Sequence, residues 1–248
     1  MDKIQKNGVK SIEVGARLLR GLIETRHAVS LKNLAAMAGM QPSKAHRYLV
    51  SFVQTGLIQQ DPATKHYLLG EMALQIGIAA IDRYAPLTRA IKVQGALCDQ
   101  FDKTVILSVW GSHGPVTVNV AESSHPIIMT MKVGATLPML ATAAGLIFGA
   151  FLPRIVTSKI IRAELRTVSN TIFPGRTKAS VDRLLASVKR DGIAINKGHL
   201  IPGVGAIAAP LVNSQGQLIA VASVIGQEES LDMQLDSDIA NRLRAAAR

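Results

Sequence analysis

The seven residues from 41 to 47 bring together side chains that bind phosphates and the edges of nucleic-acid bases. They include the amide of Gln41, the hydroxyl of Ser43, the ammonium of Lys44 and the guanidinium of Arg47. Groups of these types donate hydrogen bonds to phosphate oxygens and to base edges in the DNA grooves. No acidic residue occurs from 25 to 60, so this part of the chain favours a polyanionic partner.

Two short helices joined by a tight turn are expected to position these side chains. Ser30 is a good N-cap, Gly39 suits a helix end, and Pro42 fits the first turn of the second helix. The expected inward residues are Leu31, Leu34, Ala35 and Ala38 in the first helix and Ala45, Leu49, Phe52 and Val53 in the second. The polar donors of the second helix then face outward, as they also would on an ordinary solvated helix.

A hairpin is predicted directly behind the second helix. Leu57 and Ile58 indicate one strand, residues 61–64 carry turn chemistry, and residues 67–69 return as the other strand. Lys65 lies beside this turn and Lys32 lies on the preceding helix, so both extend the basic surface. An earlier helix over 11–25 would complete the core, with Ile12, Ala16, Leu19, Leu22 and Ile23 inward. These elements predict a winged helix-turn-helix, whose second helix enters a DNA groove.

The remainder of the chain predicts a separate α+β domain with one antiparallel sheet. A helix over 70–84, ended by Pro86, is the candidate linker, and a helical linker can transmit a rotation. Strands are expected at 105–110, 116–120, 127–131, 193–196, 205–212 and 218–225. Helices are expected at 88–101, 140–151, 155–166, 178–190 and from 235 to the end.

Composition and charge narrow the class of protein further. The 248 residues carry a net charge of +11, which suits a nucleic-acid partner. The charge is spread over the chain, with +5 in residues 1–84 and +6 in the rest. The lone Cys98 excludes an intramolecular disulfide and makes a thiolate metal cluster implausible, which fits a reducing cytoplasm. The N-terminus lacks the apolar core of a signal peptide.

The sequence gives little support to a membrane span, to dinucleotide binding, or to catalysis and metal binding by histidines. The uncharged run 133–151 is interrupted by Pro138 and continues only to Pro153, so it predicts a buried helix too short to span a membrane. Residues 203–208 match a dinucleotide fingerprint, but Pro210 and a turn follow where that motif requires a helix. His113, His125 and His199 have no partners in sequence that suggest catalysis or a metal site.

Six stretches of the chain, in order, resemble the family of IclR-type transcriptional regulators. They are GMQPSKAHRYL at 39–49, GLIQQDP at 56–62, YLLG at 67–70, VGATLP at 133–138, ATAAG at 141–145 and PGVGAIAAP at 202–210. The resemblance implies a winged helix-turn-helix over 1–69, a linker helix over 70–85 and a GAF/PAS-like effector-binding domain over 86–248. One recognition helix reads too few base pairs for specificity, so we expect a homodimer or homotetramer on a palindromic operator in double-stranded DNA, with no metal, cofactor or membrane.

The resemblance further implies a small-molecule pocket in the second domain. The positions carried over are Met129, Leu137, Leu140, Ala143, Ala144, Leu146, Asn196, Val204, Ala206, Ser223 and Ile225. Backbone N–H groups at Ala143 and Ala144 suit a carboxylate at a helix N-terminus. Several positions that are polar in the family are apolar here, which predicts an aromatic or hydrophobic carboxylic acid as effector. A ligand-free sensor with a plain core, a membrane-associated sensor and a small-molecule enzyme are the alternatives.

Overall fold

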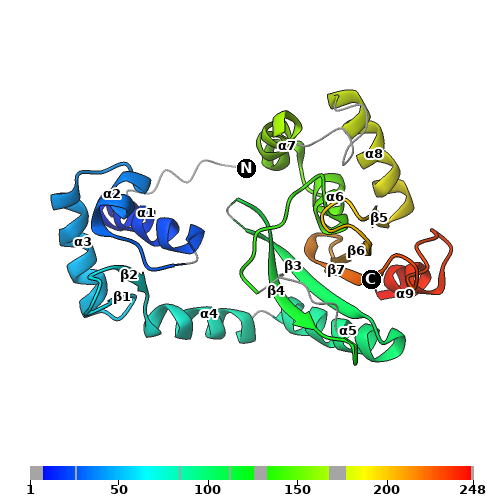
Figure 1. Ribbon diagram of the computed structural model, residues 1–248, viewed down its shortest axis with the longest axis horizontal. Helices are drawn as coiled ribbons and strands as arrows, with labels where there is room; N and C mark the ends of the chain where they lie inside the picture. Colours follow the sequence, from blue (N-terminus) through cyan, green and yellow to red (C-terminus); the bar gives the residue numbers. More distant parts are fainter. Residues whose placement is uncertain are drawn as a thin grey trace. The chain divides into compact units, whose positions relative to one another are not determined.

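The computed structural model describes residues 8–25, 27–83, 85–111, 113–125, 133–167 and 177–246. The chain forms two compact units, Met1–Arg83 and Tyr84–Arg248 (Figure 1). The strand expected at 127–131 and the pocket position Met129 lie outside the described residues. Each unit is described by itself below.

The first unit is the predicted winged helix-turn-helix. Its elements are α1 (Lys10–Glu24), α2 (Leu31–Met37), α3 (Pro42–Gln54), β1 (Ile58–Gln60), β2 (Tyr67–Leu69) and α4 (Glu71–Arg83). Ser30 caps α2 by accepting a hydrogen bond from the Asn33 N–H, and Gly39 ends the helix with φ +62°. In the wing, Asp61 Oδ1 accepts the N–H groups of Ala63 and Thr64 at 2.8 and 2.7 Å. The local signals read from the sequence therefore define this unit.

The buried face of α1 differs in part from the predicted one. The predicted inward residue Leu22 is buried and Leu19 packs against the core, but Ile12 and Ile23 are 71% and 68% exposed. The buried stripe also includes Val14 and Leu18 with Gly15 and Gly21. The two glycines explain the difference, because they let the core approach the helix closely. A Cβ on Gly15 would lie 2.8 Å from the Phe52 ring, and one on Gly21 would lie 2.9 Å from Leu34.

On α3 the predicted inward face is confirmed for Ala45 and Leu49, which are both buried. Phe52 packs against the same core, but Val53 is 39% exposed and is not part of it. The core of the unit also includes Ile58 and Tyr67 from the wing strands. The wing is therefore anchored to the helices by its own apolar side chains.

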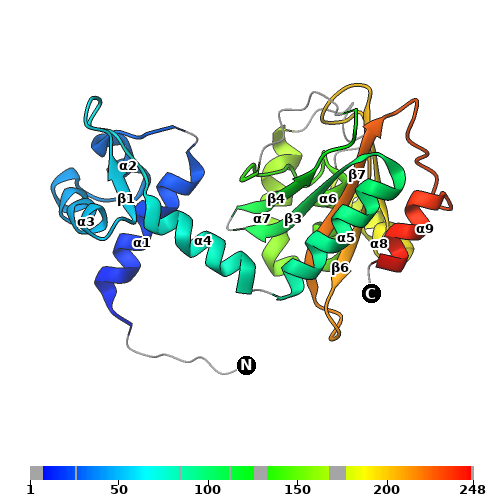
Figure 2. The ribbon, with the colours of Figure 1, turned by 90° about the horizontal axis from the view of Figure 1, so that it is seen from below.

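The second unit is the expected α+β domain built on one antiparallel sheet. Its strands are β3 (Thr104–Gly111), β4 (Gly114–Ala121), β5 (Ala194–Lys197), β6 (Val204–Val212) and β7 (Leu218–Gln227), in the order β4-β3-β7-β6-β5. Its helices are α5 (Ala85–Phe101), α6 (Ala143–Phe151), α7 (Arg154–Thr167), α8 (Lys178–Asp191) and α9 (Asp238–Ala246). Figure 2 shows α5 running across the sheet.

The two faces of this sheet support two apolar cores. Val105 and Leu107 of β3 join the core that contains residues of α5 and α9. Ala208 of β6 and Val221 of β7 join the other core, which contains most of α6. Residues 143–150 of α6 are all buried, as expected for a helix that is apolar on every side. The uncharged run is thus a central helix of this unit, and no helix within the described residues is long and apolar enough to cross a membrane.

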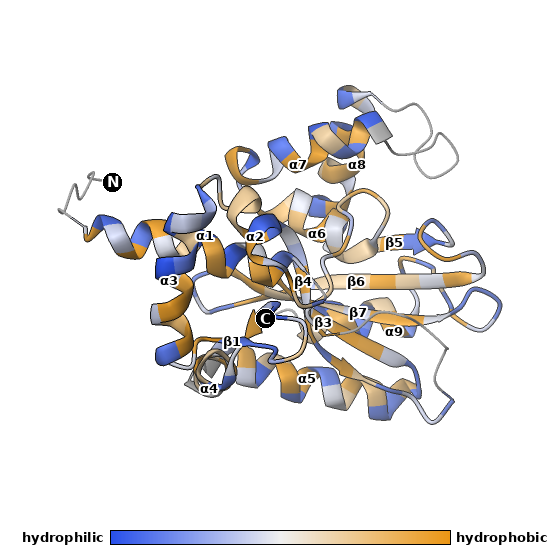
Figure 3. Cartoon of the chain, turned by 60° about the vertical axis from the view of Figure 1, so that its left-hand side comes forward, coloured by the Kyte–Doolittle hydropathy of each residue, from blue (hydrophilic) through white to orange (hydrophobic). Residues whose placement is uncertain are grey.

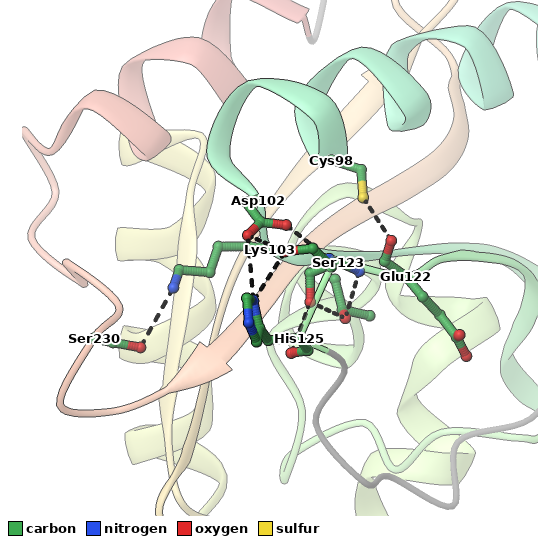
Figure 4. Close-up of polar contacts among 9 residues, drawn as sticks. Cys98, Asp102, Lys103, Glu122, Ser123, His125 and Ser230 are labelled. Atoms are coloured by element: carbon green, nitrogen blue, oxygen red, sulfur yellow. Dashed lines mark hydrogen bonds and ion pairs between the residues drawn. The ribbon is translucent and has the colours of Figure 1, made fainter.

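A group of polar contacts connects the end of α5 to the residues that follow β4 (Figure 4). Asp102 accepts the Ser124 N–H at 2.7 Å and the Ser124 hydroxyl at 2.5 Å. These bonds lower the pKa of the Asp102 carboxyl, the hydroxyl more than the N–H. Cys98 Sγ donates to the Glu122 carbonyl, and its burial raises the pKa of the thiol. Cys98 is therefore a structural thiol with little thiolate character.

Candidate functional site

The predicted anion-binding side chains of the first unit lie on its surface. Gln41, Ser43, Lys44 and Arg47 are all exposed around the start of α3, whereas Ala45 and Leu49 of the same helix are buried. Neither Lys44 nor Arg47 forms an ion pair within the described part of the chain. Their charges are therefore available to a ligand.

Lys32 and Lys65 add to this surface from other elements. Lys32 is exposed in the first turn of α2. Lys65 is exposed in the wing and has φ +60°, a left-handed conformation held by a 2.9 Å bond from its N–H to the Asp61 carbonyl. The turn therefore presents the Lys65 side chain at the end of the hairpin. Both lysines are exposed, and their contact with phosphates stays a prediction from the sequence.

The second unit contains a cavity between the start of α6 and the sheet. The empty space within it is about 460 Å³ when its opening to solvent is included. Its lining residues are Ile106, Leu137, Ala141, Thr142, Ala143, Ala144, Asn196, Leu200, Ile201, Val204, Ala206, Ser223 and Ile225. None of them is charged, so the cavity is apolar with a few uncharged polar groups.

The structure brings most of the predicted pocket positions to this cavity. Those present are Leu137, Ala143, Ala144, Asn196, Val204, Ala206, Ser223 and Ile225. Leu140 and Leu146 are not among the lining residues, and this part of the prediction is corrected. Both are buried in the core around α6, Leu140 just before the helix and Leu146 about one turn beyond its start.

Five further lining residues were not predicted. Ile106 reaches the cavity because β3 pairs with β7 so that Ile106 lies opposite Ser223. Ala141 and Thr142 precede Ala143 in the ATAAG stretch, and only the approach of the helix start to the sheet brings them to the cavity. Leu200 and Ile201 come from the loop between β5 and β6. These residues meet at the cavity only through the tertiary packing of separate elements, which the spacing of residues within one element does not predict.

The polar groups of the cavity include one with no partner. The Ser223 hydroxyl is buried, with 4% of the residue exposed, and has no hydrogen-bond partner among the described residues. Asn196 Nδ2 lies 3.1 Å from His199 Nδ1, so that side chain is held in place. A buried hydroxyl without a partner is costly unless a ligand or water completes its hydrogen bonding.

The start of α6 is built so that its N–H groups border the same cavity. The Thr142 hydroxyl caps the helix by accepting the Gly145 N–H at 3.0 Å, and it donates to the Pro138 carbonyl at 2.6 Å. The preceding N–H groups, those of Ala143 and Ala144, have no acceptor inside the helix. They and the helix dipole favour an anion at this end of the cavity.

Glu164 on α7 holds the turn that leads into this helix start. Its carboxylate oxygens accept the N–H groups of Met139 and Leu140 at 2.7 and 2.9 Å. Gly145 fits against the same turn, since a Cβ there would lie 2.3 and 2.4 Å from the carbonyls of Met139 and Pro138. Both features fix the backbone beside the cavity, and neither was predicted from the sequence.

The dinucleotide fingerprint at 203–208 is excluded by its context. Residues Val204–Val212 form strand β6, so no helix follows the glycines to hold a pyrophosphate. Within the described residues no group of three or more His, Cys, Asp or Glu side chains is arranged to hold a metal ion.

Comparison with known proteins agrees with this arrangement. Residues 79–248 match the family model described as the bacterial transcriptional regulator IclR C-terminal domain, and residues 11–62 match the IclR helix-turn-helix domain. The chain belongs to the IclR family. Members of this family are transcriptional regulators with a C-terminal effector-binding domain, and that description applies to this chain.

Individual IclR-family relatives match over most of their length. The chain is 26% identical over 226 residues to the glycerol operon regulatory protein of Streptomyces griseus, covering 90% of this chain and 87% of that protein. It is 24% identical to the transcriptional repressor IclR of Escherichia coli, and the match covers 88% of this chain and 80% of that protein. Among solved structures, HmgR of Pseudomonas aeruginosa is 35% identical to this chain with a TM-score of 0.60. The match covers 97% of this chain and 96% of HmgR.

Proposed function

We propose that this IclR-family regulator binds a palindromic operator through α3 and that an aromatic or hydrophobic carboxylic acid in the second unit sets its operator affinity. The observation that carries the proposal is the pairing of two surfaces in one chain. One is an exposed, unpaired cationic face on a helix-turn-helix, and the other is an apolar cavity beside a helix N-terminus. We place this action in the cytoplasm, where bacterial DNA lies, and we assign the chain no enzymatic activity.

The DNA contact rests on the residues of α3 and its flanks. Lys44 and Arg47 contact phosphate or guanine, with Gln41 and Ser43 beside them, because recognition helices present such groups near their N-terminal end. Lys32 and Lys65 contact the phosphate backbone and position the helix. In this proposal the winged helix spans residues 1–69, followed by the linker helix at 70–85 and the effector-binding domain at 86–248.

A symmetric oligomer is supported by the surface of α4. Glu71 and Gln75 lie along one side of this helix, and the exposed large apolar side chains over the rest of it are Met72, Leu74, Ile76, Ile78 and Ile81. A helix of this kind requires a covering partner, and we assign that role to a second copy of the chain. A homodimer or homotetramer presents two copies of α3, as an inverted repeat of half-sites requires.

The effector class follows from the cavity lining. An apolar wall contributes roughly 25 cal/mol for each Å² of apolar ligand surface buried, which favours an aromatic or alkyl body. The N–H groups of Ala143 and Ala144 then receive the carboxylate, and the Ser223 hydroxyl gains its missing partner. An IclR homologue from Microbacterium hydrocarbonoxydans, 20% identical to this chain, was crystallised with 4-hydroxybenzoate, which is an acid of this class.

Selection of DNA from a random pool tests operator binding. The full-length protein is mixed with random duplexes, and the retained DNA is sequenced with and without benzoate. We expect an inverted repeat whose half-sites lie about one helical turn, or a multiple of it, apart. Retained DNA without any common motif contradicts the proposal.

Calorimetry tests the effector class. Benzoate, 4-hydroxybenzoate, glyoxylate and pyruvate are titrated separately into the full-length protein. The apolar cavity predicts heat of binding with the two aromatic acids and much weaker binding of the two keto acids. Tight binding of glyoxylate or pyruvate with none of the aromatic acids would refute the assignment.

A further inference from the structure

The excess positive charge of the second unit is concentrated in one part of it. Residues 154–191 contain nine basic and three acidic residues, whereas the rest of Tyr84–Arg248 contains eight basic and eight acidic residues. All of the net charge of this unit therefore lies in α7, α8 and the chain between them. Net charge spread evenly over a surface would only aid solubility, but a one-sided concentration indicates a partner.

The three acidic residues of this segment are already engaged. Glu164 accepts backbone N–H groups of Met139 and Leu140. Asp182 pairs with Arg154, and Asp191 pairs with Arg190. Each of the three carboxylates therefore has hydrogen-bond or ion-pair partners other than Lys159, Arg162, Lys178 and Arg183.

Four exposed cations of these helices have no acidic partner in the described part of the chain. They are Lys159 and Arg162 on α7 and Lys178 and Arg183 on α8. Arg162 is held by a 3.2 Å bond from its Nε to the Ser158 carbonyl, which leaves its terminal nitrogens for another acceptor. We call Lys159, Arg162 and Lys178 the α7–α8 cationic surface.

Both helices contribute to one groove on this surface. Arg162 and Lys178 of this surface line it, together with Arg154, Ser158, Ile161, Leu165, Val181 and Asp182. Lys159 and Arg162 are three residues apart and so lie on neighbouring positions of one helix face. Figure 3 shows hydrophilic bands on both helices, in contrast to the largely hydrophobic strands of the sheet.

We infer that the α7–α8 cationic surface binds the phosphate backbone of duplex DNA as a second contact, in addition to α3. Duplex DNA is the densest polyanion that a regulator of this family meets, and neutralising its phosphates releases counterions. Because both surfaces belong to one chain, the second contact forms at high effective concentration once α3 is bound. The inference rests on the proposed operator binding, and it assigns the effector-binding unit a direct share of DNA affinity without sequence specificity.

The salt dependence of DNA binding by the full-length protein tests this inference. The triple variant Lys159→Gln/Arg162→Gln/Lys178→Gln is compared with Lys92→Gln/Lys197→Gln/Arg242→Gln, which removes the same charge from exposed positions elsewhere on the unit. Affinities are measured by fluorescence anisotropy for a selected operator and a scrambled duplex of about 40 base pairs. We expect the first variant to lower the slope of log affinity against log salt by about 2 to 3, equally for both duplexes.

Equal slopes for the two triple variants overturn the inference. Binding of both variants to phosphatidylserine vesicles and to polyglutamate is measured in parallel. If the slopes are equal and the first variant alone loses one of these ligands, the surface serves a membrane or an acidic protein and not DNA. If the first variant melts at a lower temperature than the control, the single variant Lys178→Gln replaces it in the comparison. We expect this variant to lower the slope of log affinity against log salt by about 1. The variant Lys44→Gln/Arg47→Gln tests operator reading separately, because it removes the preference for the selected duplex.

Discussion

Arg47 is the side chain of α3 best suited to read a base. Its guanidinium presents a planar pair of donors that matches the acceptors of guanine, whereas Lys44 acts as a point charge. Replacing Arg47 by Gln is expected to cost about 1–3 kcal/mol of operator affinity and to relax the preference at one base position. Gel shifts with operators substituted at single positions measure both effects.

Arg17→Gln is the matched control for Arg47. Arg17 is exposed on α1, outside the proposed contact surface, and its substitution removes the same charge. The control is expected to bind the operator like the wild type. If both variants lose the same affinity, bulk charge and not recognition by α3 accounts for binding.

Ser223 distinguishes a ligand cavity from a plain core. Its buried hydroxyl has no partner in the described structure, so Ser223→Ala is expected to leave stability unchanged or to raise it by up to about 1 kcal/mol. The same change removes a hydrogen bond to the effector and is expected to weaken benzoate binding by about two- to tenfold. Thermal melting and calorimetry measure the two effects.

Ser108→Ala provides the comparison for Ser223. Ser108 is also buried without a partner, but it does not line the cavity. Its substitution is expected to affect stability in the same way and to leave benzoate affinity unchanged. Equal effects of the two substitutions on benzoate binding would count against the cavity as the effector site.

At the scale of elements, the sequence predicted best what is decided locally. Ser30, Gly39 and Pro42 set the limits of α2 and α3 through their own backbone preferences, and the structure confirms them. The buried face of α1 was missed because glycines form part of it, and glycine carries no apolar signal. The Glu164 contacts with the turn before α6 join residues about 25 positions apart, so they depend on tertiary packing.

The apolar surface of α4 predicts the oligomeric state. Leu74 and Ile78 are 64% and 58% exposed in the isolated chain, and they lie four residues apart on one face. Leu74→Glu/Ile78→Glu is expected to convert the oligomer into monomers, because a buried unpaired charge at an interface is costly. Analytical ultracentrifugation measures the change, and Gln75→Glu on the same helix is the control. An unchanged sedimentation coefficient would exclude α4 as the interface.

The contacts of Asp102 predict a pH-dependent contribution to stability. Hydrogen bonds from Ser124 lower the pKa of Asp102 below its ordinary value of 3.8. A carboxylate with a depressed pKa stabilises the folded state above the unfolded pKa, and the contribution is lost as pH falls through the folded pKa. Asp102→Asn is expected to melt below the wild type at pH 7, and the gap should narrow as pH falls below 3.8. A gap that stays constant into strong acid would contradict this.

At the scale of the whole molecule, α4 is the element through which the two parts of the chain connect. By contacts it belongs to the unit Met1–Arg83, whereas the match to the family's C-terminal domain begins at residue 79. Its helical structure agrees with the linker expected at 70–84. A continuous helix between an effector site and a DNA-binding unit can transmit a change that a flexible linker would absorb.

The charge of the molecule is also divided between the two units. Residues 1–84 carry +5 and the remainder carries +6, so bulk charge does not locate the DNA contact. The net charge of the second unit lies within residues 154–191, which include α7 and α8. Part of the DNA affinity is therefore expected to reside outside the winged helix.

A ligand in the cavity is proposed to change the affinity of α3 for DNA. The operator affinity of the full-length protein, measured with and without saturating benzoate at fixed salt, tests this coupling. We expect a change of about 5- to 150-fold, and an equal change in benzoate affinity when operator is bound. Identical operator affinity in both conditions, with calorimetry showing the cavity occupied, would contradict it.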